Sequence, residues 1–218
     1  MLGKVAVIAV GSGLSGLLVR WLTRRRAKSA PPIKDLEDLK NRYFELATAY
    51  YVAGRYAFYA NLWTPCGNLF HHAIEMFLKG HLCLTFTTEE LRKLGHNLPR
   101  IWRRFKRATG DARLDAFVQT IRDVHAFEAI RYPEHFFATK GATWGFAPTR
   151  ADVDRNRQVT TTPRPLPRYE LALEEVDRLV LLLFEICDRN PKAFLQGGED
   201  WTKYLTMGNS AWPPAKTP

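Results

Sequence analysis

The segment Asn68-Leu-Phe-His-His-Ala-Ile-Glu-Met-Phe-Leu-Lys79 determines most of what can be predicted about this chain. Apolar side chains occupy nearly every side of a helix with this sequence, which is typical of a helix at the centre of a bundle. Asn68, His72, Glu75 and Lys79 nevertheless share one face, because residues three or four positions apart lie above one another on a helix. We therefore expect a central helix with a partly buried polar stripe.

Two interpretations of this polar stripe are open. In the first, it is an internal network in which Glu75 and Lys79 form an i,i+4 ion pair and a neighbour satisfies His72. In the second, it lines a polar pocket that holds a ligand phosphate or a base. A metal site is not predicted, because His71 and Glu75 are one turn apart but the HExxH pattern and its relatives are absent. No cofactor is predicted either.

The segments that flank this helix have helical periodicity too. Thr87 and Glu90 form the pattern of a capping box, which predicts a short helix. The apolar face of the next predicted helix begins at Leu98, and that helix ends near Gly110. A long first helix is predicted from apolar residues at alternating steps of three and four, with Asp35 as its N-cap. That stripe consists of Leu36, Leu39, Tyr43, Leu46, Tyr50, Ala53, Ala57 and Ala60. The fold class predicted is all-α, an antiparallel bundle of about five helices over residues 35–190.

Two regions interrupt or follow the predicted bundle. Residues 132–168 contain several prolines and glycines and lose the helical period, so we expect a long irregular insert. A last, well-buried helix is predicted over 169–188. Residues 191–218 are rich in Pro and Gly and are expected to form a loosely structured tail.

The N-terminal residues 1–28 form a separate problem. Val5–Val19 carries no charge, and Arg20, Arg24–Arg26 and Lys28 follow it. This pattern predicts a short apolar helix that anchors the chain in a membrane, with the body of the protein on the cytoplasmic side. A frayed or mis-started N-terminus would explain the same residues.

A nucleotide-binding fold is the third interpretation of the N-terminus. Lys4–Val10 followed by Gly11, Gly13 and Gly16 matches strand–GxGxxG–helix. That fingerprint needs an acidic residue about 20 positions later and a repeated βαβ pattern. Basic residues and prolines stand there instead, so this interpretation is disfavoured.

Composition limits the class of partner. The chain has 218 residues, 46% hydrophobic and 25% charged, which excludes a wholly disordered chain. Its 32 Lys and Arg against 22 Asp and Glu give a net charge of +10, which favours nucleic acid or an anionic membrane as partner. The three scattered cysteines, Cys66, Cys83 and Cys187, exclude a disulfide framework and are typical of a reducing compartment.

The basic residues gather between Arg92 and Arg113, where eight of them accompany a single acid, Asp111. On the helix predicted around Leu98–Phe105, arginines lie opposite the apolar side. Crowding of one sign of charge is an indication of phosphate contacts, although a solubilising surface would have the same pattern. The nucleic-acid-binding candidates are Arg100, Arg103, Arg104 and Arg107.

Four segments together resemble a known family. They are Tyr50–Ala57, Asn68–Lys79, Lys93-Leu-Gly-His-Asn-Leu98 and Ile130-Arg-Tyr-Pro133. In this order they are similar to the landmarks of HEPN (higher eukaryotes and prokaryotes nucleotide-binding) domains. The resemblance covers roughly residues 35–190 and implies a helical bundle, a homodimer, and a ligand site at His72, Glu75, Lys79, His96 and Arg131.

The resemblance also bears on catalysis. Active HEPN ribonucleases use an Arg followed after four to six residues by a His, in metal-independent chemistry shared by both subunits of a dimer. None of the six histidines here has that spacing; Arg131 and His135 come closest, with Pro133 between them. They are therefore weak catalytic candidates.

The function expected from the resemblance is a non-catalytic binding or dimerisation module. It would bind RNA or a nucleotide in a toxin–antitoxin, defence or accessory setting, beside a toxin, an antitoxin or a nucleotidyltransferase. A membrane-tethered structural adaptor and a weak metal-independent ribonuclease are the alternatives.

Overall fold

The computed structural model describes residues 36–132, 134–159, 166–194 and 199–212. These residues are mainly helical, as predicted, but they also include a two-stranded sheet, so the class is mainly α rather than all-α. They all belong to one unit, Asp35–Pro218. Segment 1–28, with its predicted anchor and apolar helix, lies outside the described residues, as does the N-cap predicted at Asp35. Within the four ranges, none of the helices combines the length and the apolar character that a bilayer crossing requires.

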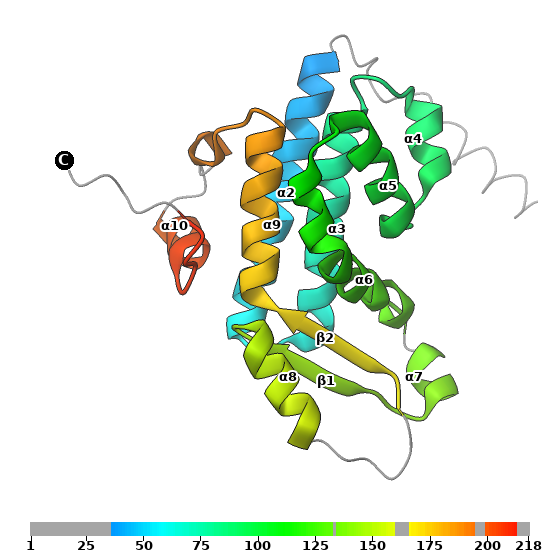
Figure 1. Cartoon of the computed structure of the whole chain (residues 1–218), viewed down its shortest axis with the longest axis vertical. Coiled ribbons are helices and arrows are strands. Elements are labelled where there is room, and N and C mark those ends of the chain that lie inside the picture. Colours follow the sequence, from blue (N-terminus) through cyan, green and yellow to red (C-terminus); the bar gives the residue numbers. More distant parts are fainter. Residues whose placement is uncertain (1–35, 133, 160–165, 195–198, 213–218) are drawn as a thin grey trace, which may run out of the picture. The chain divides into compact units, whose positions relative to one another are not determined.

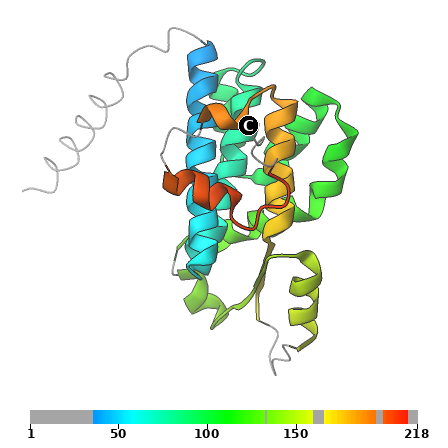
Figure 2. The same ribbon diagram turned by 90° about the vertical axis from the view of Figure 1, so that its left-hand side faces the viewer.

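Helices α2 (Leu36–Tyr59) and α3 (Trp63–Leu82) pack against each other along their length, and α9 (Leu173–Ile186) lies beside them (Figures 1 and 2). The stripe predicted for α2 is confirmed in part, since Ala57 is buried and Leu39, Tyr43 and Tyr50 pack partly buried against the core. Phe44, Tyr51 and Phe58 are buried, whereas Leu36 and Leu46 are 58% and 49% exposed. The aromatic residues, seven positions apart, provide the larger apolar surface, and this decides which face turns inward.

The next helices follow the sequence prediction closely. The Thr87 hydroxyl accepts a hydrogen bond from Glu90 N, while the Glu90 carboxylate accepts one from Thr87 N at 2.8 Å, so the capping box is confirmed. Gly110 has φ +68° and ends the helix that begins at Leu98 in the left-handed conformation, as the sequence suggested. The elements are α4 (Thr88–Leu94), α5 (Leu98–Thr109), η1 (Ala112–Phe117), α6 (Val118–Ala126) and η2 (Phe127–Ile130).

The predicted irregular insert is wrong. Residues 132–168 include α7 (Glu134–Thr139), β1 (Thr143–Ala147) and α8 (Arg150–Val159), and β1 pairs in parallel with β2 (Arg168–Ala172). The two strands and α8 lie at one end of the α2–α3 pair (Figure 1). Consequently the first residues of the predicted last helix form a strand, and α9 begins only at Leu173.

Aromatic packing explains why the strands form. The Phe146 ring on β1 lies 4.9 Å from that of Trp63 and 5.4 Å from that of Phe127, and the Trp144 and Tyr169 rings are 5.4 Å apart. Two strands alone are marginally stable in water, so this packing on the helices supplies the missing support.

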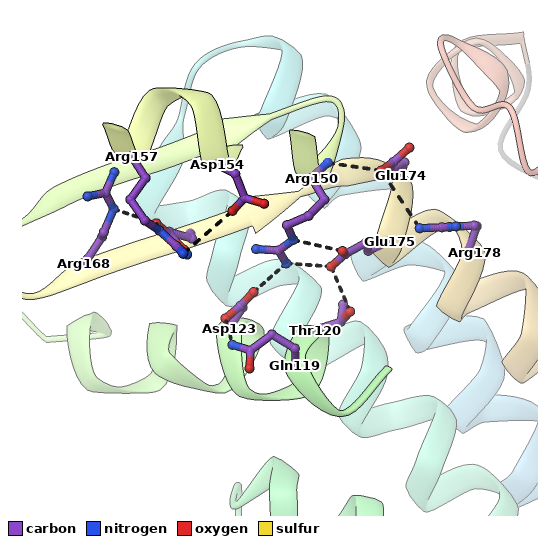
Figure 3. Close-up of polar contacts among 11 residues, drawn as sticks. Gln119, Thr120, Asp123, Arg150, Asp154, Arg157, Arg168, Glu174, Glu175 and Arg178 are labelled. Atoms are coloured by element: carbon purple, nitrogen blue, oxygen red, sulfur yellow. Dashed lines mark hydrogen bonds and ion pairs between the residues drawn. The ribbon is translucent and has the colours of Figure 1, made fainter. Parts of the chain in front are cut away.

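Ion pairs fasten α8 to the helices (Figure 3). The Arg150 guanidinium donates to Asp123 of α6 at 2.7 Å and to Glu175 of α9 at 2.6 Å. These bonds, first of all those to Glu175, raise the pKa of Arg150 despite its burial. On the strand side, Arg157 and Arg168 both pair with the buried carboxylate of Glu170.

Of the residues predicted to form a loosely structured tail, 191–218, the structure describes 191–194 and 199–212, and these include helices and buried side chains. After η3 (Pro191–Phe194), α10 (Glu199–Thr206) lies on α2 (Figure 2). Leu205, Asn209 and Trp212 are buried. Burial of these side chains and the hydrogen bonds described next hold the segment against the core.

A buried guanidinium connects α2, α9 and the C-terminal residues. Arg55 has no solvent exposure and forms an ion pair with Asp177 of α9. Its Nε donates to the Tyr204 carbonyl at 2.6 Å, and its Nη2 donates to the Met207 carbonyl. The Tyr51 hydroxyl donates to Asp177 at 2.6 Å, and burial keeps the pKa of Tyr51 well above its ordinary value. The guanidinium thus joins three parts of the chain that are far apart in sequence.

Replacing Arg55 with Met should strongly destabilise the protein, because Asp177 would remain buried without its cation. Removing one partner of a buried ion pair costs about 3–5 kcal/mol in the free energy of unfolding. Urea unfolding followed by circular dichroism measures the loss. The matched control is Arg42→Met on the same helix, whose pair with Asp38 is exposed and should contribute little. Equal unfolding midpoints for the two variants would contradict this role of Arg55.

Candidate functional site

Glu75 is a carboxylate with no solvent exposure in the middle of α3. Phe70, Ile74 and Phe77 on the same helix are fully buried core residues. An ionised group in such surroundings must be paired and hydrogen-bonded, because removing an unpaired charge from water is very unfavourable. The partners of Glu75 therefore define the site.

Two side chains pair with this carboxylate. Lys79 Nζ donates to Glu75 Oε1 at 2.7 Å from one turn further along α3. His96 Nδ1 lies 3.1 Å from Oε1 and 3.0 Å from Oε2, from the corner between α4 and α5. Burial raises the pKa of Glu75, but the hydrogen bonds from Lys79 and His96 outweigh burial, so its pKa lies below the ordinary value.

The α4–α5 corner holds His96 in place. Gly95 has φ +61°, a conformation that favours glycine, and its carbonyl accepts a hydrogen bond from Lys79 Nζ at 2.8 Å. Asn97 caps α5 by accepting a hydrogen bond from its first turn. A single ammonium group thus binds both the buried carboxylate and the corner that delivers the histidine.

His71 lies under this corner and is fully buried. Its Nε2 is 3.1 Å from the His96 carbonyl oxygen, and since a carbonyl only accepts, Nε2 carries the proton. Burial is the main cause that lowers the pKa of His71 to about 4. His71 is therefore neutral near pH 7 and supports the corner.

His72 is half-buried at the edge of the site. Its Nδ1 is 3.9 Å from Glu75 Oε2, and its ring centroid is 6.2 Å from that of His96 and 5.5 Å from that of Tyr50. Burial lowers the pKa of His72, Glu75 opposes that shift, and Arg131 adds to it. The effect of Arg131 places its charge in the electrostatic neighbourhood of His72.

Arg131 reaches the site because η2 packs closely on α3. A Cβ at Gly67 would stand 2.0 Å from the Phe127 ring, so only glycine allows this approach. Glu128 of η2 pairs with Arg131 at 3.5 Å and lies 3.9 Å from His71 Nδ1. The side chain of His135, the other weak catalytic candidate, lies outside the described part of the chain.

Of the predicted ligand-binding residues, His72, Lys79 and His96 surround Glu75, and Arg131 lies directly after η2, paired with Glu128. Lys79 is buried and forms the predicted i,i+4 pair with Glu75, and its second partner, the Gly95 carbonyl, was not predicted. Glu75 is likewise internal. His72, His96 and Arg131 are partly exposed and remain accessible to a ligand.

The basic side of α5 is confirmed as an exposed surface. Arg100 donates to the Lys93 carbonyl at 3.4 Å. The members of this face, which we call the α5 arginine face, are Arg100, Arg103, Arg104 and Arg107, all exposed.

Sequence reasoning missed His125 and Glu128, and it considered His71 only as a metal ligand. The imidazole rings of His71 and His125 are 5.6 Å apart, and Glu128 lies 3.9 Å from His71 Nδ1. The helical wheel places His71 on the apolar side of α3, so its burial could be predicted. The proximity of His125 could not, because it depends on how α6 packs on α3.

Comparison with known proteins adds no identification. No protein-family model matched this sequence, and no curated protein and no solved structure matched it either.

Replacing Glu75 with Gln should destabilise the protein, because the Lys79 ammonium would remain buried without its anionic partner. The expected loss is about 3–5 kcal/mol in the free energy of unfolding, measured by urea titration. The double variant Glu75→Gln/Lys79→Met should regain part of this loss, since no charge of the pair remains buried.

The matched control for that measurement is Glu89→Gln. Glu89 pairs with Lys93 at the same i,i+4 spacing but on an exposed surface, so its replacement should matter little. If Glu75→Gln and Glu89→Gln unfold at the same urea concentration, the carboxylate of Glu75 does not organise the site.

Proposed function

We propose that residues 35–190 form a HEPN-like antiparallel bundle of about five helices that binds RNA or a nucleotide without cleaving it. The four segments of the resemblance support this, since they fall on α2, on α3, at the α4–α5 corner and directly after η2. As the resemblance implies, the chain would act as a homodimer in a toxin–antitoxin, defence or accessory setting.

The observation that carries this proposal is the proximity of His72 and His96, whose ring centroids are 6.2 Å apart, together with the pKa of His72, which burial lowers and the charge of Arg131 lowers further. The three residues come from α3, from the α4–α5 corner and from the end of η2, and their side chains are 21%, 53% and 34% exposed. Imidazole and guanidinium groups are suitable donors for phosphate oxygens. Glu75 and Lys79 act behind them by holding His96 in position.

The α5 arginine face extends this surface. α5 begins at Leu98, two positions after His96, so a bound chain that contacts His96 could continue along the arginines. Arg103, Arg104 and Arg107 have no ion-pair partner among the described residues, which leaves their charges available to phosphates. A basic face of this kind provides affinity for the backbone rather than sequence recognition.

If RNA binds here, the affinity for a short single-stranded RNA should fall as salt rises, and Arg103→Ala/Arg104→Ala should flatten this dependence. The slope of log affinity against log salt should decrease by about 0.7 for each phosphate that is no longer neutralised by an arginine. Fluorescence anisotropy at several salt concentrations measures the slope.

The matched control is Arg42→Ala/Arg178→Ala, which removes the same charge from exposed positions on α2 and α9. It should leave the slope close to that of the wild type. A slope reduced equally in both double variants would contradict a role of the α5 arginine face, and undetectable binding would contradict the proposal as a whole.

A second function, metal-independent RNA cleavage, is favoured by one detail of the site. His96 directs Nδ1 to the buried carboxylate of Glu75, while its ring is about half exposed. A carboxylate that orients an imidazole in this way favours general acid–base catalysis, and Arg131 could stabilise charge on a phosphate. If this function holds, the chain cleaves the RNA that it binds, and the proposal of binding without cleavage is wrong.

RNA cleavage in EDTA tests this alternative. His96→Gln and Arg131→Ala should each lower the rate by about a hundredfold or more, since the acid–base and charge-stabilising groups would be missing. His81→Gln, on α3 but in contact with Phe105 instead of Glu75, is the control. Equal cleavage by all variants would indicate a contaminating nuclease, and the alternative would be rejected.

A further inference from the structure

His72, Glu75 and His96 each offer one atom that could bind a metal, and these atoms all lie within 4.8 Å of one another. His96 Nδ1 is 3.0 Å and His72 Nδ1 is 3.9 Å from the same carboxylate oxygen, Glu75 Oε2. We propose that these three side chains bind a divalent first-row transition-metal ion, with Zn²⁺ as the reference ion.

The donor set determines which metals suit the site. Two imidazole nitrogens and one carboxylate oxygen are typical of zinc and of other late first-row ions. Mg²⁺ and Ca²⁺ prefer oxygen donors, of which this cluster offers one carboxylate. Three protein ligands leave at least one coordination position open to water or to an oxygen of a ligand.

The separations are compatible with coordination. Ligand atoms about 2.1 Å from a tetrahedral zinc ion are roughly 3.4 Å from one another. The two distances to Glu75 Oε2, 3.0 and 3.9 Å, lie on either side of that value. Coordination needs an unprotonated Nδ1 on both histidines, so the proton that His96 Nδ1 donates to Glu75 moves to Nε2 or to solvent when the ion binds. The partial exposure of both rings leaves room for small adjustments.

The backbone that presents these ligands is well held. His72 and Glu75 are three positions apart on α3, the same i,i+3 spacing with which helical bundles present His and Glu to metal ions. His96 lies outside α3, and the hydrogen bond from His71 of α3 to the His96 carbonyl holds it against this helix. Sequence motifs such as HExxH could not reveal this set, because its third ligand comes from another element.

The surrounding charges also suit a metal ligand. Lys79 Nζ binds Glu75 Oε1, while Oε2 lies 3.0 Å from His96 Nδ1 and 3.9 Å from His72 Nδ1, with the Nε2 of the buried His71 behind it at 3.6 Å. Such outer hydrogen bonds orient ligating carboxylates in metal sites generally. The positive charges of Lys79 and Arg131 are balanced by the negative charges of Glu75 and Glu128. These four side chains together therefore carry no net charge that would repel a cation.

Titration of the untagged, EDTA-treated full chain with ZnCl₂ in a calorimeter tests this proposal, which does not depend on RNA binding. One zinc ion should bind per chain and should raise the thermal unfolding midpoint. His72→Gln and His96→Gln should each lower the affinity by at least about tenfold. With Co²⁺ as probe, the visible absorption of a four-coordinate complex should appear in the wild type and be absent from both variants.

The control is His81→Gln, a histidine on the same helix outside the cluster, which should bind zinc like the wild type. Without metal, His72→Gln should keep the wild-type unfolding midpoint, because His72 Nδ1 is 3.9 Å from Glu75, whereas His96→Gln should lower it, because the buried carboxylate loses a hydrogen-bond donor. The midpoint shift caused by zinc is therefore compared with the metal-free midpoint of the same variant. The proposal is overturned if the wild type binds no stoichiometric zinc, if both variants bind it unchanged, or if Mg²⁺ gives the same midpoint shift as Zn²⁺.

Discussion

A carboxylate without solvent exposure in the middle of α3 sets the arrangement of everything around it. The charge of Glu75 has to be compensated, and Lys79 is the residue of α3 that donates a hydrogen bond to it. The second partner, His96, comes from the α4–α5 corner, so this corner must lie against α3. Apolar packing would tolerate several placements of α4 and α5, whereas a buried charge with defined hydrogen bonds accepts very few.

The contacts of α2 with α9 and the C-terminal residues also depend on a buried charge, but here the charge is positive. There a buried cation, Arg55, gathers Asp177 from α9 and two carbonyls from the C-terminal residues. The apolar core consists of ordinary aliphatic and aromatic side chains. The protein therefore combines a core that favours compactness with two polar centres that select one arrangement of its elements.

Much of the helical part could be predicted, because its signals are local. The helical wheel placed His72, Glu75 and Lys79 on one face, and the Thr87 capping box needs only four residues. What could not be predicted depends on distant partners. Arg55 meets Asp177 across 122 positions, and β1 needs β2, which follows only after α8. The wheel also could not show that Lys79 bonds to Gly95 and is thereby withdrawn from ligands.

The two carbonyls that bind Arg55 belong to Tyr204 and Met207, 149 and 152 positions after it in the chain. A ribosome therefore has to translate as far as Met207 before the buried guanidinium has all of its acceptors. Products of premature termination would contain a guanidinium group with missing acceptors, and they would be exposed to cellular proteases in proportion to their unfolded fraction. The stability of this protein is thereby coupled to the synthesis of residues 204–207, long after that of Arg55.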